Sequence, residues 1–231
     1  MQITNNLTKY FFNEKTIIKC AYCTDIYQLH KEISEDKDLD TFILLKEKKQ
    51  NTDILSAYNR NDFAELYLFF DYDGHATLAN DEKIKEILDF FNEETSYGKL
   101  FISYPMVEAL KHYSDTIDFK LLKVKAKEKI KYKKMVSEQC HEQLINITKY
   151  SRIIWIKLIK VHLKKLNYIV NNNYSLPTYN ISQNDIFLNQ LVKFINIDLT
   201  VAVLSSFPIF LFDYYGNDYI VKLLKNNYDI L

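Results

Sequence analysis

The sequence contains little glycine, proline or cysteine. Only three residues of each type occur among 231, beside 18 tyrosines and 15 phenylalanines. The shortage of glycine and proline excludes a collagen-like chain, a flexible Gly/Ser linker and a Pro-rich segment. Three cysteines are an odd number and do not describe a disulfide framework. With 48% hydrophobic and 26% charged residues, the composition is that of a globular protein with a sizeable, aromatic-rich core.

Long hydrophobic runs are also missing. The longest weakly polar run, Leu199 to Phe212, is too short to cross a bilayer and is interrupted by two serines and Pro208. Residues 1–12 show no basic segment followed by an apolar stretch, which a secretory signal would require. We therefore expect no membrane association and a cytoplasmic location.

Charge is unevenly distributed, although 30 basic and 30 acidic side chains balance over the whole chain. Residues 1–119 hold 13 basic and 22 acidic side chains (net charge −9). Residues 120–170 hold 14 and 3 (net +11), and residues 171–231 hold 3 and 5 (net −2). The basic segment can attract phosphate even though the molecule is neutral. An acidic partner, or the acidic first part of the chain, is the alternative ligand for it.

The first 119 residues alternate short apolar runs with amphipathic ones, which is typical of a mixed α/β sheet. We therefore predict an α/β fold in which residues 1–119 form one domain, a sheet with flanking helices. The predicted elements are a strand over Thr16–Cys20, a helix over Asp25–Ile33, strands over Thr41–Leu45 and Leu66–Phe70, a helix capped by Asn80 or Asp81, a strand over Lys99–Ser103 and a short helix after Pro105.

Residues 120–231 are predicted to form a basic, mainly helical region that packs on the first domain. Between residues 120 and 133 lysine occupies almost every odd position, which lines one face of an extended chain but spreads around a helix. The conformation of this segment stays open. Residues 137–170 have the spacing of one long helix with an apolar and a basic face, and Ser182 caps another helix through about Phe194. The tail ending in FPIFLFDYYG is expected in the core.

Two carboxylates one residue apart follow the predicted buried strand, in the sequence YLFFDYDGH. On an extended chain Asp71 and Asp73 project to the same side, at the strand end where open α/β sheets bind ligands. Mg²⁺ takes one or two protein carboxylates together with waters and substrate phosphates. Gly74, one of only three glycines in the chain, lies in the turn beside the two acids. The motif predicts a Mg²⁺ or Mn²⁺ site, although a solvated Asp/Gly turn fits the same residues.

Other residues near this motif have two interpretations each. Glu108 can supply a third metal ligand, or it can favour the dipole of the helix that it begins. His75 can contact phosphate, although a histidine after a turn glycine is more often solvated. Cys20 and Cys23 have the spacing of half a zinc site, but no second ligand pair follows, so packing is the better explanation.

The basic residues of the second region are the candidate nucleic-acid contacts. They would hold the phosphate backbone, which attracts basic side chains in RNA and DNA alike. Trp155 lies among them, but an aromatic residue at helical spacing usually belongs to a core, and His162 is placed on the polar face. The predicted contacts are Lys123, Lys125, Lys127, Lys129, Lys131, Lys133, Arg152, Lys157, Lys160 and Lys164.

Three segments together resemble a known family. They are DYDGH, the segment from Phe90 to Tyr113, and the tail VLSSFPIFLFDYYG. With the predicted order of strands and helices, they are similar to the Toprim nuclease effector of PARIS-type anti-phage defence, a relative of the overcoming-lysogenisation-defect Toprim nucleases. The resemblance covers nearly the whole chain. It implies a Toprim sheet and a toxic ribonuclease that an ABC-type ATPase sensor holds and that, once released, acts on host tRNA in abortive infection.

The resemblance also implies a catalytic glutamate at the end of the first strand, in a Glu-Gly-x-Thr-Asp-like sequence. The matching stretch is CAYCTD, residues 20–25, so Ala21 occupies the position of the glutamate. A methyl group neither takes a proton nor binds a cation. The chain is therefore either an inactivated variant of a toxic nuclease or the product of a lineage that only binds. We favour the first because Asp71 and Asp73 persist together with the basic region.

We therefore expect a magnesium-dependent Toprim ribonuclease in which Asp71 and Asp73 hold the cation and position 21 serves the nucleophile. Two alternatives stay open: a non-catalytic Toprim-fold subunit that binds an ABC-type ATPase, and a DNA nuclease of the overcoming-lysogenisation-defect type. The sequence has no Walker-type loop, so nucleotide hydrolysis would belong to a partner. The aromatic content is compatible with a homodimer, although no coiled-coil seam indicates one.

Overall fold

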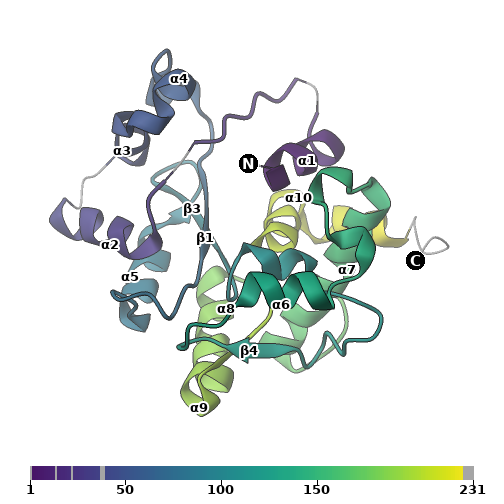
Figure 1. Ribbon diagram of the computed structural model, residues 1–231. Helices are drawn as coiled ribbons and strands as arrows, with labels where there is room; N and C mark the ends of the chain where they lie inside the picture. Colours follow the sequence, from purple (N-terminus) through teal and green to yellow (C-terminus); the bar gives the residue numbers. More distant parts are fainter. Residues whose placement is uncertain (1, 14, 22, 37–39, 226–231) are drawn as a thin grey trace. The chain divides into compact units, whose positions relative to one another are not determined.

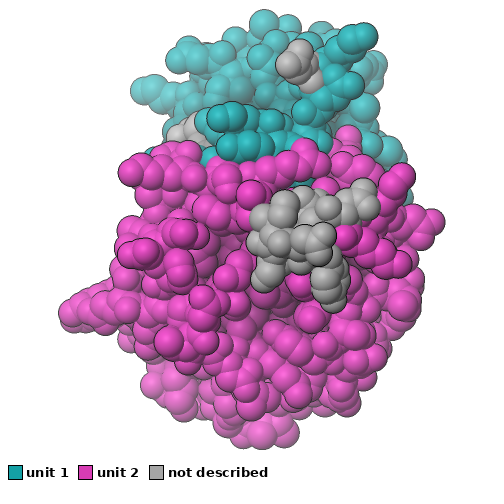
Figure 2. All heavy atoms as spheres, turned by 90° about the vertical axis from the view of Figure 1, so that its right-hand side faces the viewer, with its two compact units in different colours: residues 1–68, 80–100 teal, residues 69–79, 101–231 magenta. Residues whose placement is uncertain are grey.

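The computed structural model describes residues 2–13, 15–21, 23–36 and 40–225. The protein divides into two compact units, each made of segments that are separate in the sequence (Figure 2). Unit 1 comprises residues 1–68 and 80–100, and unit 2 comprises residues 69–79 and 101–231. The predicted domain boundary after residue 119 lies inside unit 2. Many helices and small sheets make this a mixed α/β protein.

Unit 1 is built mainly from short helices. They are α1 (Gln2–Phe11), α2 (Ile26–Glu35), α3 (Thr41–Glu47), α4 (Thr52–Leu55) and α5 (Asp81–Phe90), with the 3₁₀ turns η1 (Lys49–Asn51) and η2 (Arg60–Asp62). The side chains of Asp25 and Asn80 accept hydrogen bonds from backbone N–H groups in the first turns of α2 and α5, as helix caps do. Helices α2 and α5 lie side by side (Figure 1). These two predicted helices are confirmed.

Two predicted strands of unit 1 are wrong. Residues 16–20 form no strand, and Thr41–Leu45 forms the first turns of α3. The carboxylate of Asp40 accepts hydrogen bonds from the N–H groups of Phe42 (2.8 Å) and Ile43 (3.2 Å), which starts a helix at this point. A run of five apolar residues is too short for its hydrophobic periodicity to distinguish a strand from a buried helical turn. Here the capping residue Asp40 determines that the segment is helical.

A three-stranded sheet in the order β1-β3-β2 continues along the chain from unit 1 into unit 2. Its strands are β1 (Tyr67–Asp71), β2 (Asn92–Glu93) and β3 (Gly98–Ser103). The Lys99 N–H donates to the Leu66 carbonyl (2.9 Å), and the Tyr72 N–H donates to the Ser103 carbonyl (3.0 Å). Strands β1 and β3 are therefore parallel, whereas β2 pairs antiparallel with β3. The predicted strands at β1 and β3 are confirmed, and their carboxyl ends share one edge in unit 2.

Unit 2 holds the remaining helices and a two-stranded antiparallel sheet in which Val124 lies opposite Val201. Its elements are η3 (Val107–Lys111), β4 (Lys123–Lys125), α6 (Tyr132–Gln139), η4 (Glu142–Leu144), η5 (Ile147–Lys149), α7 (Arg152–Asn171), α8 (Gln183–Gln190), the π-helical η6 (Leu191–Ile195), α9 (Asn196–Asp198), β5 (Thr200–Ala202) and α10 (Ser206–Lys225). Helix α7 packs against both α10 and α8. Ser182 caps α8, as predicted.

The helix predicted over residues 137–170 is interrupted. Helix α6 ends at Gln139, two 3₁₀ turns follow, and α7 begins after Ser151. The Ser151 hydroxyl accepts a hydrogen bond from the Ile154 N–H (3.3 Å), so this serine is a cap and not part of an apolar face. Helix α7 is buried around most of its circumference, and His162, predicted on the polar face, lies in the core.

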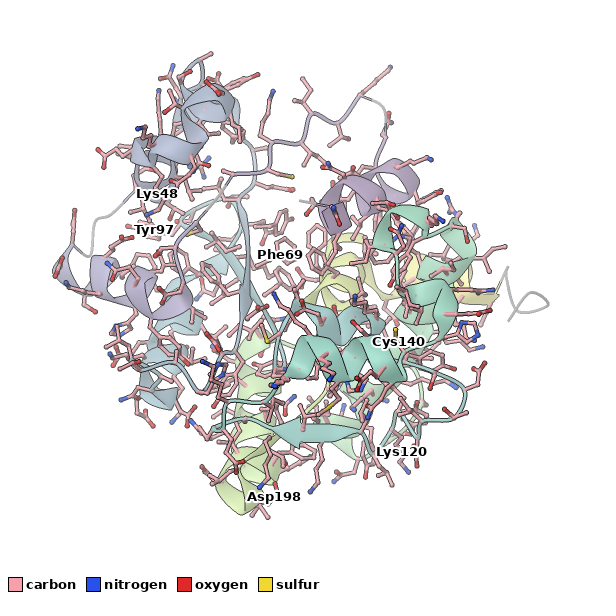
Figure 3. The ribbon with its side chains drawn as sticks, in the orientation of Figure 1. Lys48, Phe69, Tyr97, Lys120, Cys140 and Asp198 are labelled. Carbon is pink, nitrogen blue, oxygen red and sulfur yellow. The ribbon has the colours of Figure 1, made fainter. Side chains whose placement is uncertain are left out.

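Aromatic side chains fill the core of unit 2. Phe69 of β1, labelled in Figure 3, stacks on Phe207 with 4.7 Å between ring centroids, and Phe210 meets it edge-on at 5.3 Å. Trp155 is fully buried beside Tyr150. Because rings of this size bury much apolar area, they dominate the packing of the unit. The expectation that Trp155 belongs to the core is confirmed, and that for the tail ending in FPIFLFDYYG holds for FPIFLF, whereas residues 213–216 are half-buried.

Two ionisable side chains of α7 lie inside this core. Lys165 is fully buried, donates to the Leu122 carbonyl and lies 4.6 Å from the centre of the Phe119 ring. Burial holds the pKa of its ammonium well below the usual value, and the charge of Asp118 opposes this effect. His162 is also fully buried, and burial lowers its pKa to about 3. Burial therefore shifts both side chains toward their neutral forms.

We expect Lys165→Met to remove a pH dependence of stability. The pKa of Lys165 is lower in the folded than in the unfolded chain, so unfolding takes up a proton between these two values. The contribution of Lys165 to the free energy of unfolding therefore rises with pH. Urea unfolding from about pH 7 to about pH 10 should show wild type gaining stability relative to the variant. The control Lys164→Met should show no such trend, and a pH-independent difference for Lys165→Met would contradict the prediction.

Candidate metal and nucleic-acid site

Asp71 ends β1 and is the first carboxylate of the site. Its neighbours Phe70 and Tyr72 are buried. The N–H of Val107 donates to Asp71 Oδ1 at 2.7 Å. Val107 begins η3, shortly after the carboxyl end of β3, and so the parallel strand pair positions both partners of this hydrogen bond. The carboxylate thus lies at the sheet edge where α/β proteins bind ligands.

Glu108, the next residue of η3, supplies the second carboxylate. Its side chain is only 14% exposed, and the Nζ atom of Lys133 lies 3.5 Å from its Oε1. Its Oε2 atom is buried and has no hydrogen-bond partner. A buried carboxylate oxygen without a partner is unfavourable, and most native structures satisfy such atoms. A cation would satisfy this one.

Burial and mutual repulsion together favour a proton on Asp71. Burial, followed by the charge of Glu108, raises the pKa of Asp71 from 3.8 to about 7. The hydrogen bond from Val107 and the charge of Lys133 act in the opposite direction. Burial and the same two carboxylates raise the pKa of the Tyr132 phenol well above its usual value. Without a metal, Asp71 is therefore protonated in a substantial fraction of molecules near neutral pH.

Asp73 takes a different backbone conformation. Its φ of 43° is in the left-handed region, so the extended chain ends before it. Its Oδ1 pairs with Nδ1 of His75 at 2.9 Å. The extended-chain geometry predicted for the two aspartates therefore applies to Asp71 alone. The charge of Asp73 still raises the pKa of Asp71, so the two carboxylates interact.

The turn after Asp73 packs closely against the lysine-rich segment. A Cβ atom on Gly74 would lie 2.8 Å from the carbonyl oxygen of Ala126 and 2.4 Å from the ring of Tyr72. Glycine is required here because the chain approaches its neighbours so closely. The Nζ atom of Lys127 lies 5.6 Å from the centre of the same Tyr72 ring. Packing thus holds Ala126 and Lys127, in the middle of the lysine-rich segment, beside the turn that contains Asp73.

Lys123 and Lys125, the first of the alternating lysines, lie on strand β4, whereas Lys133, the last, belongs to helix α6. Over β4, Lys123 and Lys125 are exposed while Val124 is buried, and the pattern continues with the buried Ala126. Further along, Lys129, Lys131 and Lys133 are also exposed. The predicted contacts on α7 are the exposed Arg152 and the half-buried Lys157, Lys160 and Lys164.

Several of these lysines have acidic partners. Lys123 pairs with Asp198, Lys125 with Glu128 at 3.5 Å, and Lys157 with Asp115 at 3.3 Å. The net charge of residues 120–170 therefore overstates the positive charge that is available to phosphate. Sequence reasoning also missed that Lys120 lies 4.7 Å from the ring centre of Tyr168 and that Lys164 lies 5.8 Å from that of Tyr174.

Ala21 belongs to unit 1, whereas Asp71, Asp73 and Glu108 belong to unit 2. Ala21 and Cys23 pack against an apolar cluster formed by Phe42, Leu45 and Leu55. The methyl group therefore contributes to the packing of unit 1. Both Cys20 and Cys23 are free thiols, and burial raises the pKa of each. Because the thiolate is the form that binds metals and reacts, the two cysteines are poor metal ligands and poor nucleophiles.

Sequence reasoning missed the buried hydrogen-bond chain that positions α6. Nδ1 of His112 lies 3.0 Å from the Tyr132 hydroxyl, and its Nε2 lies 2.9 Å from Oε1 of Gln139. His112 is fully buried, and burial lowers its pKa. Both ends of α6 are thereby tied to η3, which places Lys133 beside Glu108. Tyr132 and Gln139 are seven residues apart, as on one helix face, but no local pattern links them to His112.

The carboxylates of the site offer a small set of donors to a metal ion. Within the described ranges, no group of three or more His, Cys, Asp or Glu side chains is arranged to hold one. The unpartnered Oε2 of Glu108 and the interacting Asp71 nevertheless form a pair of hard oxygen donors. Mg²⁺ commonly takes one or two carboxylates and completes its shell with water and substrate phosphate. The residues fit such a Mg²⁺ or Mn²⁺ ion and do not fit an all-protein cage.

A pocket of about 530 Å³ lies in unit 1, and none of these carboxylates lines it. The guanidinium of Arg60 in its wall donates to the carbonyls of Phe63 (2.6 Å), Thr95 (2.8 Å) and Ser96 (2.9 Å). Asp40, also in the wall, caps α3. The charged groups of the pocket therefore hold the fold together, and we assign it no ligand.

Comparison with protein-family models, with curated proteins and with solved structures found no significant match to the chain. Among the helices that the structure describes, none is both long enough and apolar enough to span a membrane. The function must therefore be argued from the geometry of the site and from the short motifs.

Asp71→Asn should change how stability depends on pH. The raised pKa means that the folded protein holds a proton on Asp71 more tightly than the unfolded chain does. The stabilisation that this proton gives is present below about pH 4 and is lost as pH rises to about 7. Asparagine keeps an oxygen for the Val107 N–H. In EDTA, we expect the variant to be more stable than wild type by up to about 4 kcal/mol at about pH 8, and by little near pH 4.

Urea unfolding of the two proteins across this range measures the difference. The control Asp53→Asn, on the exposed side of α4, should leave the pH dependence of wild type unchanged. Stability curves of wild type and Asp71→Asn that run parallel from low to high pH would show that Asp71 is not perturbed in the folded protein.

Proposed function

We propose that this protein is a metal-dependent nuclease of the Toprim type that acts on RNA, with tRNA as its substrate class. One observation carries the proposal. Asp71 and Glu108 are interacting carboxylates at the carboxyl end of a parallel strand pair, and one of their oxygens is buried without a partner. Such a pair next to a lysine-rich segment has the charge pattern that metal-assisted phosphodiester chemistry uses.

Each residue of the site has a role in this proposal. Asp71, oriented by the Val107 N–H, and Glu108 offer carboxylate oxygens to Mg²⁺ or Mn²⁺. Asp73, held by His75, adds negative charge next to them. A bound cation would neutralise charge on the scissile phosphate and activate the attacking water. The exposed lysines between residues 123 and 133 hold the nucleic-acid backbone.

The Toprim assignment, the role in anti-phage defence and the ABC-type ATPase partner rest on the resemblance of the motifs. In their favour, β1 ends in Asp71 and is followed by α5 and then by the parallel strand β3. Against them, residues 16–20 and Thr41–Leu45 are not strands. The proposed Toprim core is therefore the β1-α5-β3 segment and the acidic edge where its strands end.

A non-catalytic subunit is the second candidate. It is favoured by Ala21, whose methyl group packs in an apolar cluster where the resemblance places a catalytic glutamate. Such a protein would keep the fold and bind an ABC-type ATPase without cleaving nucleic acid. Metal affinity distinguishes the two candidates, because the nuclease must bind a cation at Asp71 and Glu108 whereas a non-catalytic subunit does not need one there.

Titration with Mn²⁺ tests the metal site directly. Isothermal titration of the full chain should show binding that Asp71→Asn weakens about tenfold or more and that Asp71→Asn with Asp73→Asn abolishes, because the hard oxygen donors are lost. The control Asp115→Asn removes an exposed carboxylate that pairs with Lys157 and should leave the affinity unchanged. If folded wild type binds no Mn²⁺, the nuclease proposal is contradicted and the subunit is favoured.

Ala21→Glu tests catalysis and substrate choice together. Incubated with Mn²⁺, the variant should cleave tRNA faster than plasmid DNA, because the resemblance places the general base at this position. Ala21→Gln adds the same bulk beside Phe42 and Leu45 without a carboxylate and should stay inactive. Faster cleavage of the plasmid would favour the DNA nuclease. A folded Ala21→Glu protein that cleaves neither substrate would sink the enzymatic proposal.

A further inference from the structure

Lys133 forms an ion pair with Glu108, one of the two carboxylates of the site. It is the second residue of α6, and its Nζ atom lies 3.5 Å from Glu108 Oε1. The side chain of Lys133 is 71% exposed, whereas that of Glu108 is 14% exposed. A solvated ammonium group therefore covers one oxygen of a mostly buried carboxylate, while the other oxygen has no partner.

The charge of Lys133 acts on both carboxylates of the site. It opposes the burial and the Glu108 repulsion that raise the pKa of Asp71. Its position is set by its neighbour Tyr132, which is buried and hydrogen-bonded to His112. The backbone of Lys133 is thus anchored beside η3, and its long side chain ends in solvent, free to turn toward another anion.

We propose that Lys133 is the resident counter-ion of the site and competes with a divalent cation for Glu108. The inference rests on the proposed function. In the metal-free protein, the ammonium offsets part of the repulsion between Glu108 and Asp71. A divalent cation carries twice the charge and displaces it. The released lysine then joins the exposed lysines of residues 123–131 as a phosphate contact, so that metal binding and phosphate binding favour each other.

An ordinary surface ion pair on the same helix provides the comparison. Lys134 and Glu138 lie 3.7 Å apart, with side chains 70% and 63% exposed. Lys134 is as exposed as Lys133 and adjacent to it, but its partner is not a carboxylate of the site. Lys134→Gln therefore removes the same charge from α6 without removing the proposed competitor, which makes it a matched control for Lys133→Gln.

Titration of the full chain with Mn²⁺ tests the inference. We expect Lys133→Gln to bind Mn²⁺ roughly threefold to tenfold more tightly than wild type, the effect of removing one partly screened charge. Lys134→Gln and Lys133→Arg should keep the wild-type affinity. Thermal unfolding gives a second readout. Without metal, the melting temperature of Lys133→Gln should be lower than that of wild type. Mn²⁺ should raise the melting temperature of Lys133→Gln by more than it raises that of wild type.

The outcomes separate this inference from the proposed function. If wild type and Lys133→Gln bind Mn²⁺ equally, or if Lys133→Gln binds more weakly, Lys133 is not a competitor, while the metal site itself stands. If Lys133→Gln and Lys134→Gln gain affinity to the same extent, the gain comes from the lower positive charge of α6 as a whole, and the inference fails. If no folded variant binds Mn²⁺, the metal site is contradicted and the role of Lys133 with it.

Discussion

The buried side chain of Tyr72 constrains the whole acidic edge. It is fully buried against the rings of Tyr104 (5.7 Å) and Phe187 (6.3 Å), and it stands between Asp71 and Asp73 in the chain. Because this ring is part of the core of unit 2, the aspartates on either side of it are held at the margin of that core. Asp71 is consequently too buried to be fully hydrated and too close to other acids to ionise freely.

The fold offsets the negative charge at this edge in three different ways. Asp71 favours a proton and accepts the Val107 N–H, Glu108 has the ammonium of Lys133, and Asp73 has the imidazole of His75. One oxygen of Glu108 is left without any partner. The polar network at this edge is therefore only partly satisfied, whereas buried polar groups in native structures are usually all hydrogen-bonded.

Sequence patterns were sufficient where a local signal was strong. Helices α2 and α5 have side-chain caps and helical spacing, and strand β1 is an apolar run that ends in Asp71, so each could be predicted from its own residues. Thr41–Leu45 and residues 137–170 could not, because Asp40 and Ser151 start helices at points that apolar spacing does not mark. Contacts between distant segments were also out of reach: Lys133 was predicted to bind phosphate, and its pairing with Glu108 depends on how α6 docks.

The interleaving of the two units in the sequence has a consequence for any attempt to dissect the protein. The chain passes between them three times, after Leu68, Ala79 and Leu100, so proteolysis at any one of these junctions leaves both units covalently joined. A recombinant fragment ending at residue 119 would lack α10, and the ring of Phe69 would lose its stacking partner Phe207. The acidic edge therefore depends on packing partners from the last third of the chain, where Phe187 and Phe207 lie.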